Sequence, residues 1–264
     1  MKKNSTFPII LILTFVLALT FSQTGLIKSV ITDIKKSSEE LRETINIVEN
    51  ANRQEEDEEY LFSDYSIPYY DGKDVIVVND NNPFFSQDDI VRAYSPDYEM
   101  YISFIELKEL DKLGRTQVSF MSAGPESLAD EERESIGQIK PSGWNQARYD
   151  DLIKDKYLWN RCHLLAHSIS ELNAEEKNLI TCTRQMNIGG MLDYEKQVIN
   201  YIEDTQNHVL YRVTPLYKDS ELVARGALME GLSLEKEGLK FCVFVYNVQD
   251  GIEIDYKDGS SSRK

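Results

Sequence analysis

Residues 157–195 read YLWNRCHLLAHSISELNAEEKNLITCTRQMNIGGMLDYE and hold two of the three histidines and two of the three cysteines of the chain. An apolar run at 157–159 favours a β-strand that leads directly into His163. Two leucines follow this histidine, so apolar flanks anchor the backbone on both sides of it. The pattern therefore predicts a strand end that presents one imidazole rigidly to a cleft.

Oxygen donors follow the histidine at intervals. Asn178, Asn187 and Glu195 offer amide and carboxylate oxygens, which are the ligands that a hard cation such as Mg²⁺ prefers. Gly189 and Gly190 weaken the expectation of one continuous helix from Asn187 to Glu195, because glycine is a poor helix former.

The segments on either side predict an α+β domain with a central antiparallel β-sheet flanked by helices. Residues 101–111 fit a strand or a helix, and residues 194–206 have apolar residues at helical spacing. The segments expected to form strands are 74–80, 115–124, 208–217, 222–234 and 239–248. The last residues, 257–264, are expected to fray.

The N-terminal part of the chain has a different composition. Two lysines precede the charge-free run FPIILILTFVLALTF, so residues 1–25 are expected to be a signal peptide or a membrane anchor. Residues 26–59 have apolar residues at helical spacing and end in EEDEE, which predicts a helical or disordered acidic linker. A globular domain is then expected at residues 60–264.

The overall charge limits how the chain holds its partners. A formal net charge of −16 argues against broad electrostatic wrapping of a polyanion and favours a local basic cleft.

Three cysteines cannot all pair within one chain. Cys162 and Cys182 are expected either to form a disulfide or to stay as buried apolar thiols.

Three motifs occur in an order that resembles a known family: NRCHLLAH at 160–167, EKNLITCTRQMN at 176–187 and DYE at 193–195. The order is similar to the core of the DNA/RNA non-specific endonucleases, the ββα-metal nucleases, and within them to secreted or membrane-anchored streptococcal DNases. The usual Asp-Arg-Gly-His signature stands here as Asn160-Arg161-Cys162-His163, and the resemblance runs from about Ile67 to the C-terminus.

The resemblance implies a ββα-metal catalytic core at 60–264 in an exported endonuclease that acts outside the cell, free or anchored to the membrane. Its cofactor would be Mg²⁺, with Mn²⁺ as a substitute, and its substrate DNA, with RNA left open. The absence of any base-reading motif fits cleavage without sequence preference.

The resemblance also implies roles for individual residues. His163 would be the general base, since a neutral imidazole accepts a proton near neutral pH. Asn187 would be the Mg²⁺ ligand, and Glu195 would accept hydrogen bonds from metal-bound water. Asn178 would orient the active-site loop or touch the substrate, and Arg133 would contact phosphate through bidentate hydrogen bonds.

Three further basic residues, Arg161, Arg184 and Lys140, are expected to bind substrate. For Arg161, phosphate contact and a buried ion pair remain equal alternatives. For Arg133, its acidic sequence neighbours make a surface ion pair an open alternative. His208 precedes a predicted strand and is expected to be structural.

Two residues depart from the family signature. Asn160 supplies no negative charge near the imidazole, and Cys162 adds a side chain where the family has glycine. They leave two other functions open: a nucleic-acid-binding surface protein without catalysis, and a nuclease toxin that acts on competitors. The intact set of His163, Asn187 and Glu195 favours an active enzyme.

Overall fold

The computed structural model describes residues 60–264 together with residues 32, 35–37, 39 and 42. The chain divides into two units, Met1–Glu59 and Tyr60–Lys264, and the second is described below. The signal or anchor expected at 1–25 and most of the linker expected at 26–59 lie outside the described residues. Among the described residues, no helix has the length and apolar character needed to span a membrane.

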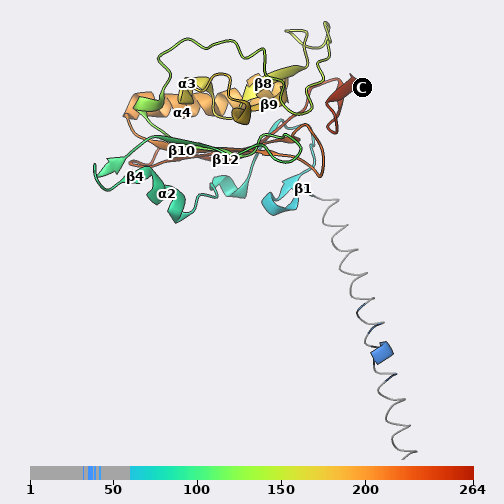
Figure 1. Cartoon of the computed structure of the whole chain (residues 1–264), viewed down its shortest axis with the longest axis horizontal. Coiled ribbons are helices and arrows are strands. Elements are labelled where there is room, and N and C mark those ends of the chain that lie inside the picture. Colours follow the sequence, from blue (N-terminus) through green and yellow to red (C-terminus); the bar gives the residue numbers. More distant parts are fainter. Residues whose placement is uncertain (1–31, 33–34, 38, 40–41, 43–59) are drawn as a thin grey trace, which may run out of the picture. The chain divides into compact units, whose positions relative to one another are not determined.

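A six-stranded antiparallel sheet lies at the centre of this unit, with the strand order β3-β12-β11-β10-β7-β6 (Figure 1). Segment 101–111, which fitted strand or helix, contributes an edge strand, and the three consecutive strands expected after residue 207 are confirmed. The strands are β3 (Val75–Val77), β6 (Phe104–Leu107), β7 (Ser119–Ala123), β10 (Val209–Leu216), β11 (Gly226–Ser233) and β12 (Lys240–Tyr246).

Different elements cover the two faces of the sheet (Figure 1). One face carries α3 (His167–Ser170), β8 (Trp159–His163), β9 (Leu179–Thr183) and α4 (Leu192–Thr205), and the other carries β1 (Tyr60–Phe62) and α2 (Gln87–Ala93). Successive side chains of β10 point to opposite faces of the sheet, so apolar residues of this strand pack against the elements on both faces. Tyr211 packs in the cluster that contains Val198 and Ile202 of α4, whereas Leu210 packs with Ala93 of α2.

The helix ends follow local sequence signals. Ser86 and Asp89 form a capping box at the start of α2, in which each side chain accepts a hydrogen bond from the other residue's backbone amide. Gln206 ends α4 in the left-handed conformation, where its amide donates to the carbonyl of Ile202.

The expectation that residues 257–264 fray is wrong. Residues 260–263 form β14 (Ser260–Arg263), which pairs with β13 (Ile252–Asp255) in an antiparallel hairpin. Gly259 has φ +78°, a conformation that glycine adopts without strain, and its carbonyl accepts a hydrogen bond of 2.9 Å from the Trp159 indole nitrogen. The turn and this tertiary bond therefore hold the tail in place.

The remaining elements are short. Two further two-stranded sheets pair β1 with β2 and β4 with β5. The bounds are β2 (Ile67–Pro68), β4 (Tyr94–Ser95), β5 (Met100–Tyr101), and the 3₁₀ turns η1 (Ser63–Tyr65), η2 (Asn79–Asn81), η3 (Pro125–Ser127) and η4 (Glu176–Asn178).

The segment 159–205 forms a ββα unit on one face of the sheet. Strands β8 and β9 pair antiparallel, with Cys162 opposite Ile180, and a disulfide joins Cys162 to Cys182 with their Cα atoms 5.9 Å apart. Of the two alternatives for these cysteines, the structure therefore has the disulfide, while Cys242 is free and buried.

A π-helical turn, η5 (Gln185–Met191), leads from β9 into α4 without a break. The backbone remains helical through Gly189 and Gly190, so the weak helix propensity of these glycines does not interrupt it. Gly190 is buried against β12, where a Cβ atom would overlap the Val245 side chain. Glycine at this position thus lets the turn lie close to the sheet, and Asn187 and Glu195 stand on one continuous helical segment.

Candidate active site

The imidazole of His163 is held in one tautomer. His163 ends β8 and is only 7% exposed. Its Nε2 lies 2.9 Å from the backbone carbonyl oxygen of Asn173, which can only accept, so Nε2 carries the proton and donates it. Its Nδ1 lies 3.2 Å from Nη2 of Arg133, and the guanidinium donates to it. The ring is therefore a neutral imidazole whose basic nitrogen is Nδ1.

The surroundings of His163 favour this neutral form. Burial lowers the pKa of His163 to about 4, and the electrostatic influence of Arg133, and then of His167, acts in the same direction. The hydrogen bond to the Asn173 carbonyl favours the charged form and opposes them. Nδ1 is thus available as a proton acceptor throughout the neutral pH range.

A pocket of about 270 Å³ opens beside His163. Its lining brings together residues from the loop before β8, from β8 itself, from α3, from η5 and from α4. Five of the eight residues predicted for the site line it: Arg133, Arg161, His163, Asn187 and Glu195. His167, Ala166, Ser168 and Leu192 complete the lining.

One wall of the pocket carries oxygen donors without protein partners. Asn187 and Glu195 are half-buried, and within the described residues neither side chain forms a hydrogen bond or an ion pair. Burial raises the pKa of Glu195 to about 7, although the charge of Arg133 opposes this shift.

This donor set fits a hard divalent cation. Amide and carboxylate oxygens are suitable ligands, and a neighbouring cation would supply the positive charge that the buried carboxyl lacks. Across residues 60–264 and the few described earlier ones, no three His, Cys, Asp or Glu side chains group as a full metal cage.

The two arginines of the pocket have different contacts. Arg133 forms no ion pair with any described residue, and its hydrogen bond goes to His163. Arg161 donates to the carbonyls of Ile139 and, at 2.8 Å, of Gly137, and its guanidinium lies 4.1 Å from the centre of the Trp144 ring. Arg161 thus holds the 137–144 loop against β8. It forms no ion pair with a described residue, and phosphate contact stays a prediction for it.

Three of the predicted residues lie outside the pocket lining. Asn178 is fully buried, and its side chain accepts from the amide of Leu165 and donates to the carbonyl of Leu165, both at 2.9 Å. Arg184 pairs with Asp155 at 2.5 Å, and Lys140 is exposed on the loop that Arg161 holds. Asn178 therefore shapes the turn after His163, and its side chain lies outside the pocket lining.

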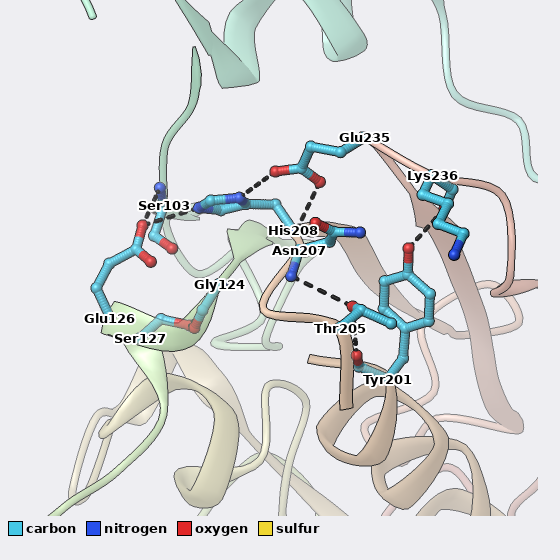
Figure 2. Close-up of polar contacts among 10 residues, drawn as sticks. All are labelled: Ser103, Gly124, Glu126, Ser127, Tyr201, Thr205, Asn207, His208, Glu235 and Lys236. Carbon is cyan, nitrogen blue, oxygen red and sulfur yellow. Dashed lines mark hydrogen bonds and ion pairs between the residues drawn. The ribbon is translucent and has the colours of Figure 1, made fainter. Parts of the chain in front are cut away.

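His208 lies outside this pocket and holds three segments together (Figure 2). Its Nδ1 is 2.5 Å from Glu235 and its Nε2 is 3.0 Å from Glu126. Burial alone would raise the pKa of Glu126, but hydrogen bonds from its own amide, from His208 and from Ser103 lower it to about 2. These contacts agree with the structural role expected for His208.

Two residues near the base received no role in the expected site. His167 lines the pocket at the start of α3, and Asn173 supplies the carbonyl that fixes the His163 tautomer. His167 stood out in the sequence as one of only three histidines. Asn173 had no distinguishing signal among the asparagines of its block, because its role depends on a backbone carbonyl.

Comparison with known proteins defines the class. Residues 101–233 match the family model described as DNA/RNA non-specific endonuclease, which is half of the chain. The chain therefore belongs to the family of DNA/RNA non-specific endonucleases, a family of nuclease hydrolases. The resemblance seen in the motifs is confirmed.

Individual relatives are streptococcal where their source is given. A protein of Streptococcus dysgalactiae subsp. equisimilis described as a deoxyribonuclease is 34% identical over 110 residues, which cover 40% of this chain and 33% of the relative. The match thus spans about a third of that relative's length.

Two solved structures share the fold. NucA from Streptococcus agalactiae with magnesium bound has a TM-score of 0.61 and 22% identity over 72% of this chain and 87% of NucA. The Sda1 nuclease with bound zinc has a TM-score of 0.54 and 26% identity over 61% of this chain and 81% of Sda1. The expected mixed fold with a central antiparallel sheet is confirmed.

Proposed function

We propose that the chain is an exported, metal-dependent endonuclease that hydrolyses phosphodiester bonds of DNA without sequence preference, with RNA as a second substrate. The observation that carries this proposal is the pocket in which Nδ1 of a neutral His163 faces Arg133, with Asn187 and Glu195 on the opposite helical segment. Family membership supplies the reaction class, and the sequence of residues 1–25 supports export.

His163 is the general base of the proposed reaction. Nδ1 takes a proton from the attacking water, while Nε2–H stays bonded to the Asn173 carbonyl before and after the transfer. The low pKa of the buried ring would make it a weak base in the free protein. A phosphate anion in the pocket raises the basicity of Nδ1, because negative charge stabilises the imidazolium.

Arg133 is the phosphate contact. In the absence of substrate its guanidinium donates to Nδ1 of His163. A phosphate group is a stronger acceptor and matches the guanidinium through two parallel hydrogen bonds. Movement of Arg133 onto phosphate would therefore free Nδ1 for water, so substrate binding and exposure of the base are coupled.

Asn187 and Glu195 are the residues that would hold the cation. When bound, a divalent cation would polarise a phosphate oxygen and stabilise the leaving oxygen. Asn187 would hold it through its amide oxygen, and Glu195 would hold it through hydrogen bonds to the cation's water. Oxygen donors favour Mg²⁺, with Mn²⁺ as a substitute. Arg161 supports the same pocket by fixing the loop next to β8.

The proposal extends to the organisation of the whole chain: a signal or anchor at 1–25, a linker at 26–59 and the nuclease domain at 60–264. An export signal of this kind would place the nuclease domain outside the cell, where extracellular nucleic acid is the substrate.

The test is cleavage of plasmid DNA, and in parallel of RNA, by the purified full-length chain with Mg²⁺, with Mn²⁺ and with EDTA. We expect metal-dependent smearing without discrete bands, and a loss of roughly 10²–10⁴ in rate for His163→Ala. His167→Ala is the matched comparison, because it removes a second imidazole that lines the same pocket, and it should lose much less activity than His163→Ala. A wild type that binds DNA but leaves it intact across pH 6–9 and several divalent metals would replace this proposal with a non-catalytic nucleic-acid-binding protein.

A further inference from the structure

Asn173 touches both the general base and the loop that carries Arg133. It lies after α3, and its backbone carbonyl accepts from Nε2 of His163 at 2.9 Å. Its side-chain Oδ1 accepts from the backbone amide of Glu134 at 2.8 Å. One residue thus contacts the imidazole through its main chain and the neighbour of Arg133 through its side chain.

The loop has few other attachments near Arg133. Before it, the amide of Ala129 donates to the carbonyl of Ser168 at 3.2 Å and the amide of Asp130 donates to Glu171 at 3.4 Å; after it, Arg161 binds the carbonyl of Gly137. Within 131–135, a stretch that is described throughout, the bond from the Glu134 amide to Asn173 is the only backbone hydrogen bond. The backbone on either side of Arg133 is exposed, so packing contributes little to its position.

We propose that Asn173 is a positioning residue, whose side chain fixes the Arg133 loop in register with His163 so that the guanidinium reaches the phosphate whose attacking water Nδ1 deprotonates. This inference rests on the proposed function. Fixing the amide of Glu134 orders the backbone one residue from Arg133 before substrate arrives, so less loop entropy is lost on binding. Because the carbonyl and the amide side chain belong to one residue, the loop and the ring keep the same relative position.

A neutral acceptor suits this position. Glu132 and Glu134 flank Arg133 in the loop, so an anionic side chain at position 173 would add to the negative charge near the phosphate path. An aspartate has the same shape and the same acceptor oxygen but adds a charge. Asn173→Asp therefore shows whether the hydrogen bond alone is sufficient or whether the side chain must also be neutral.

The first test uses steady-state cleavage of a defined DNA duplex by the full chain. Asn173→Ala removes Oδ1 but keeps the backbone carbonyl, so kcat/KM should fall roughly five- to tenfold while the pH profile stays unchanged. Asn173→Asp keeps the acceptor but adds a negative charge, so its kcat/KM should lie above that of Asn173→Ala and below that of the wild type. Asn207→Ala is the matched control, since this asparagine lies outside the pocket lining and its side chain has no hydrogen bond to any described residue.

A double-mutant comparison separates positioning from a general structural effect. If Asn173 acts through Arg133, the variant with both Asn173→Ala and Arg133→Ala should be no slower than Arg133→Ala alone. Losses that multiply in the double variant would overturn the inference, because they would mean that the two side chains act independently.

Hydrogen exchange gives a readout that needs no activity. Asn173→Ala should speed amide exchange in residues 131–135 and leave β8 and β9 unchanged. A wild type without nuclease activity would defeat the proposed function, and the exchange result would still decide the role of Asn173. Wild-type exchange together with wild-type kcat/KM in Asn173→Ala would defeat the positioning role alone.

Discussion

Acidification provides the sharpest test of how His163 is held. Burial beside Arg133 lowers its pKa from 6.5 to about 4. At pH 5 an imidazole with the lower value is about 90% neutral, whereas one with the ordinary value is about 3% neutral. Long-range ¹H–¹⁵N NMR of the full chain reports the protonation of each ring nitrogen. We expect the His163 ring to show a protonated Nε2 and a bare Nδ1 from pH 8 down to pH 5.

The same shift has a consequence for stability, and its sign follows from the two pKa values. The folded value lies below the unfolded one, so the unfolded chain binds the proton more readily as the pH falls. The stabilising contribution is complete above pH 6.5 and is lost as the pH falls toward 4. Between pH 7.5 and pH 5 the loss is about 2 kcal/mol.

Urea unfolding of the wild type and of His163→Gln at both pH values isolates this contribution, because other acid-sensitive groups are common to both proteins. The difference in unfolding free energy between the two should shrink by about 2 kcal/mol at pH 5. In the NMR experiment, His163→Gln also assigns the His163 ring signals directly, because the chain has three histidines and the substitution removes one set of ring signals. A His163 ring that titrates near pH 6.5, or a stability difference that does not change with pH, would refute the reasoning.

Three further outcomes are expected. Removal of the disulfide that closes a 20-residue separation, in Cys162→Ala/Cys182→Ala, should lower the unfolding free energy by about 3 kcal/mol, and reductant should do the same to the wild type; a reductant-insensitive wild type would contradict the crosslink. Mg²⁺ at ten times its dissociation constant should stabilise the wild type by about 1.4 kcal/mol in thermal unfolding but not Asn187→Ala; equal gains would exclude Asn187 as a ligand. With one or two phosphate contacts, kcat/KM should fall only about 3- to 12-fold between 50 and 200 mM salt; a fall of a thousandfold would require a basic surface that the pocket lacks.

Much of the fold could be predicted because alternation and turns are local. Residues 208–248 were predicted as three strands because β-branched and aromatic residues alternate between turn residues, and each segment then pairs with its neighbour. The tail was not predictable in this way. Its hairpin depends on the Trp159 indole, which lies 100 residues earlier in the sequence.

The helix that carries Asn187 and Glu195 shows the limit of propensity. Two adjacent glycines weaken a helix in isolation. Here Gly190 is required by close approach to Val245, so tertiary packing stabilises the π-helical turn that propensity disfavours. The spacing from Asn187 to Glu195 fits one pocket wall for the same reason.

For the site, the order of the motifs predicted which residues take part, but it did not predict which side chains contact one another. The pocket gathers Arg133 and His163 from positions 30 residues apart, which no local pattern connects. Asn178 shared the motif with the pocket residues, yet its amide binds the backbone of Leu165. Residue type and spacing cannot separate an asparagine that faces a cleft from one that satisfies a buried turn, because both depend on where the next segment packs.

The negative charge of the chain bears on how the pocket around His163 can bind nucleic acid. A net charge of −16 repels a polyanion at long range, so encounter with nucleic acid gains little from steering. Binding energy must then come from a few contacts inside the pocket, and Arg161 is already bound to the carbonyls of its loop. Arg133 remains as the pocket arginine whose guanidinium is bound to no carbonyl or carboxylate among the described residues. A single contact is more effective when the backbone that carries it is fixed before the substrate arrives, and the Asn173 side chain holds the backbone next to Arg133.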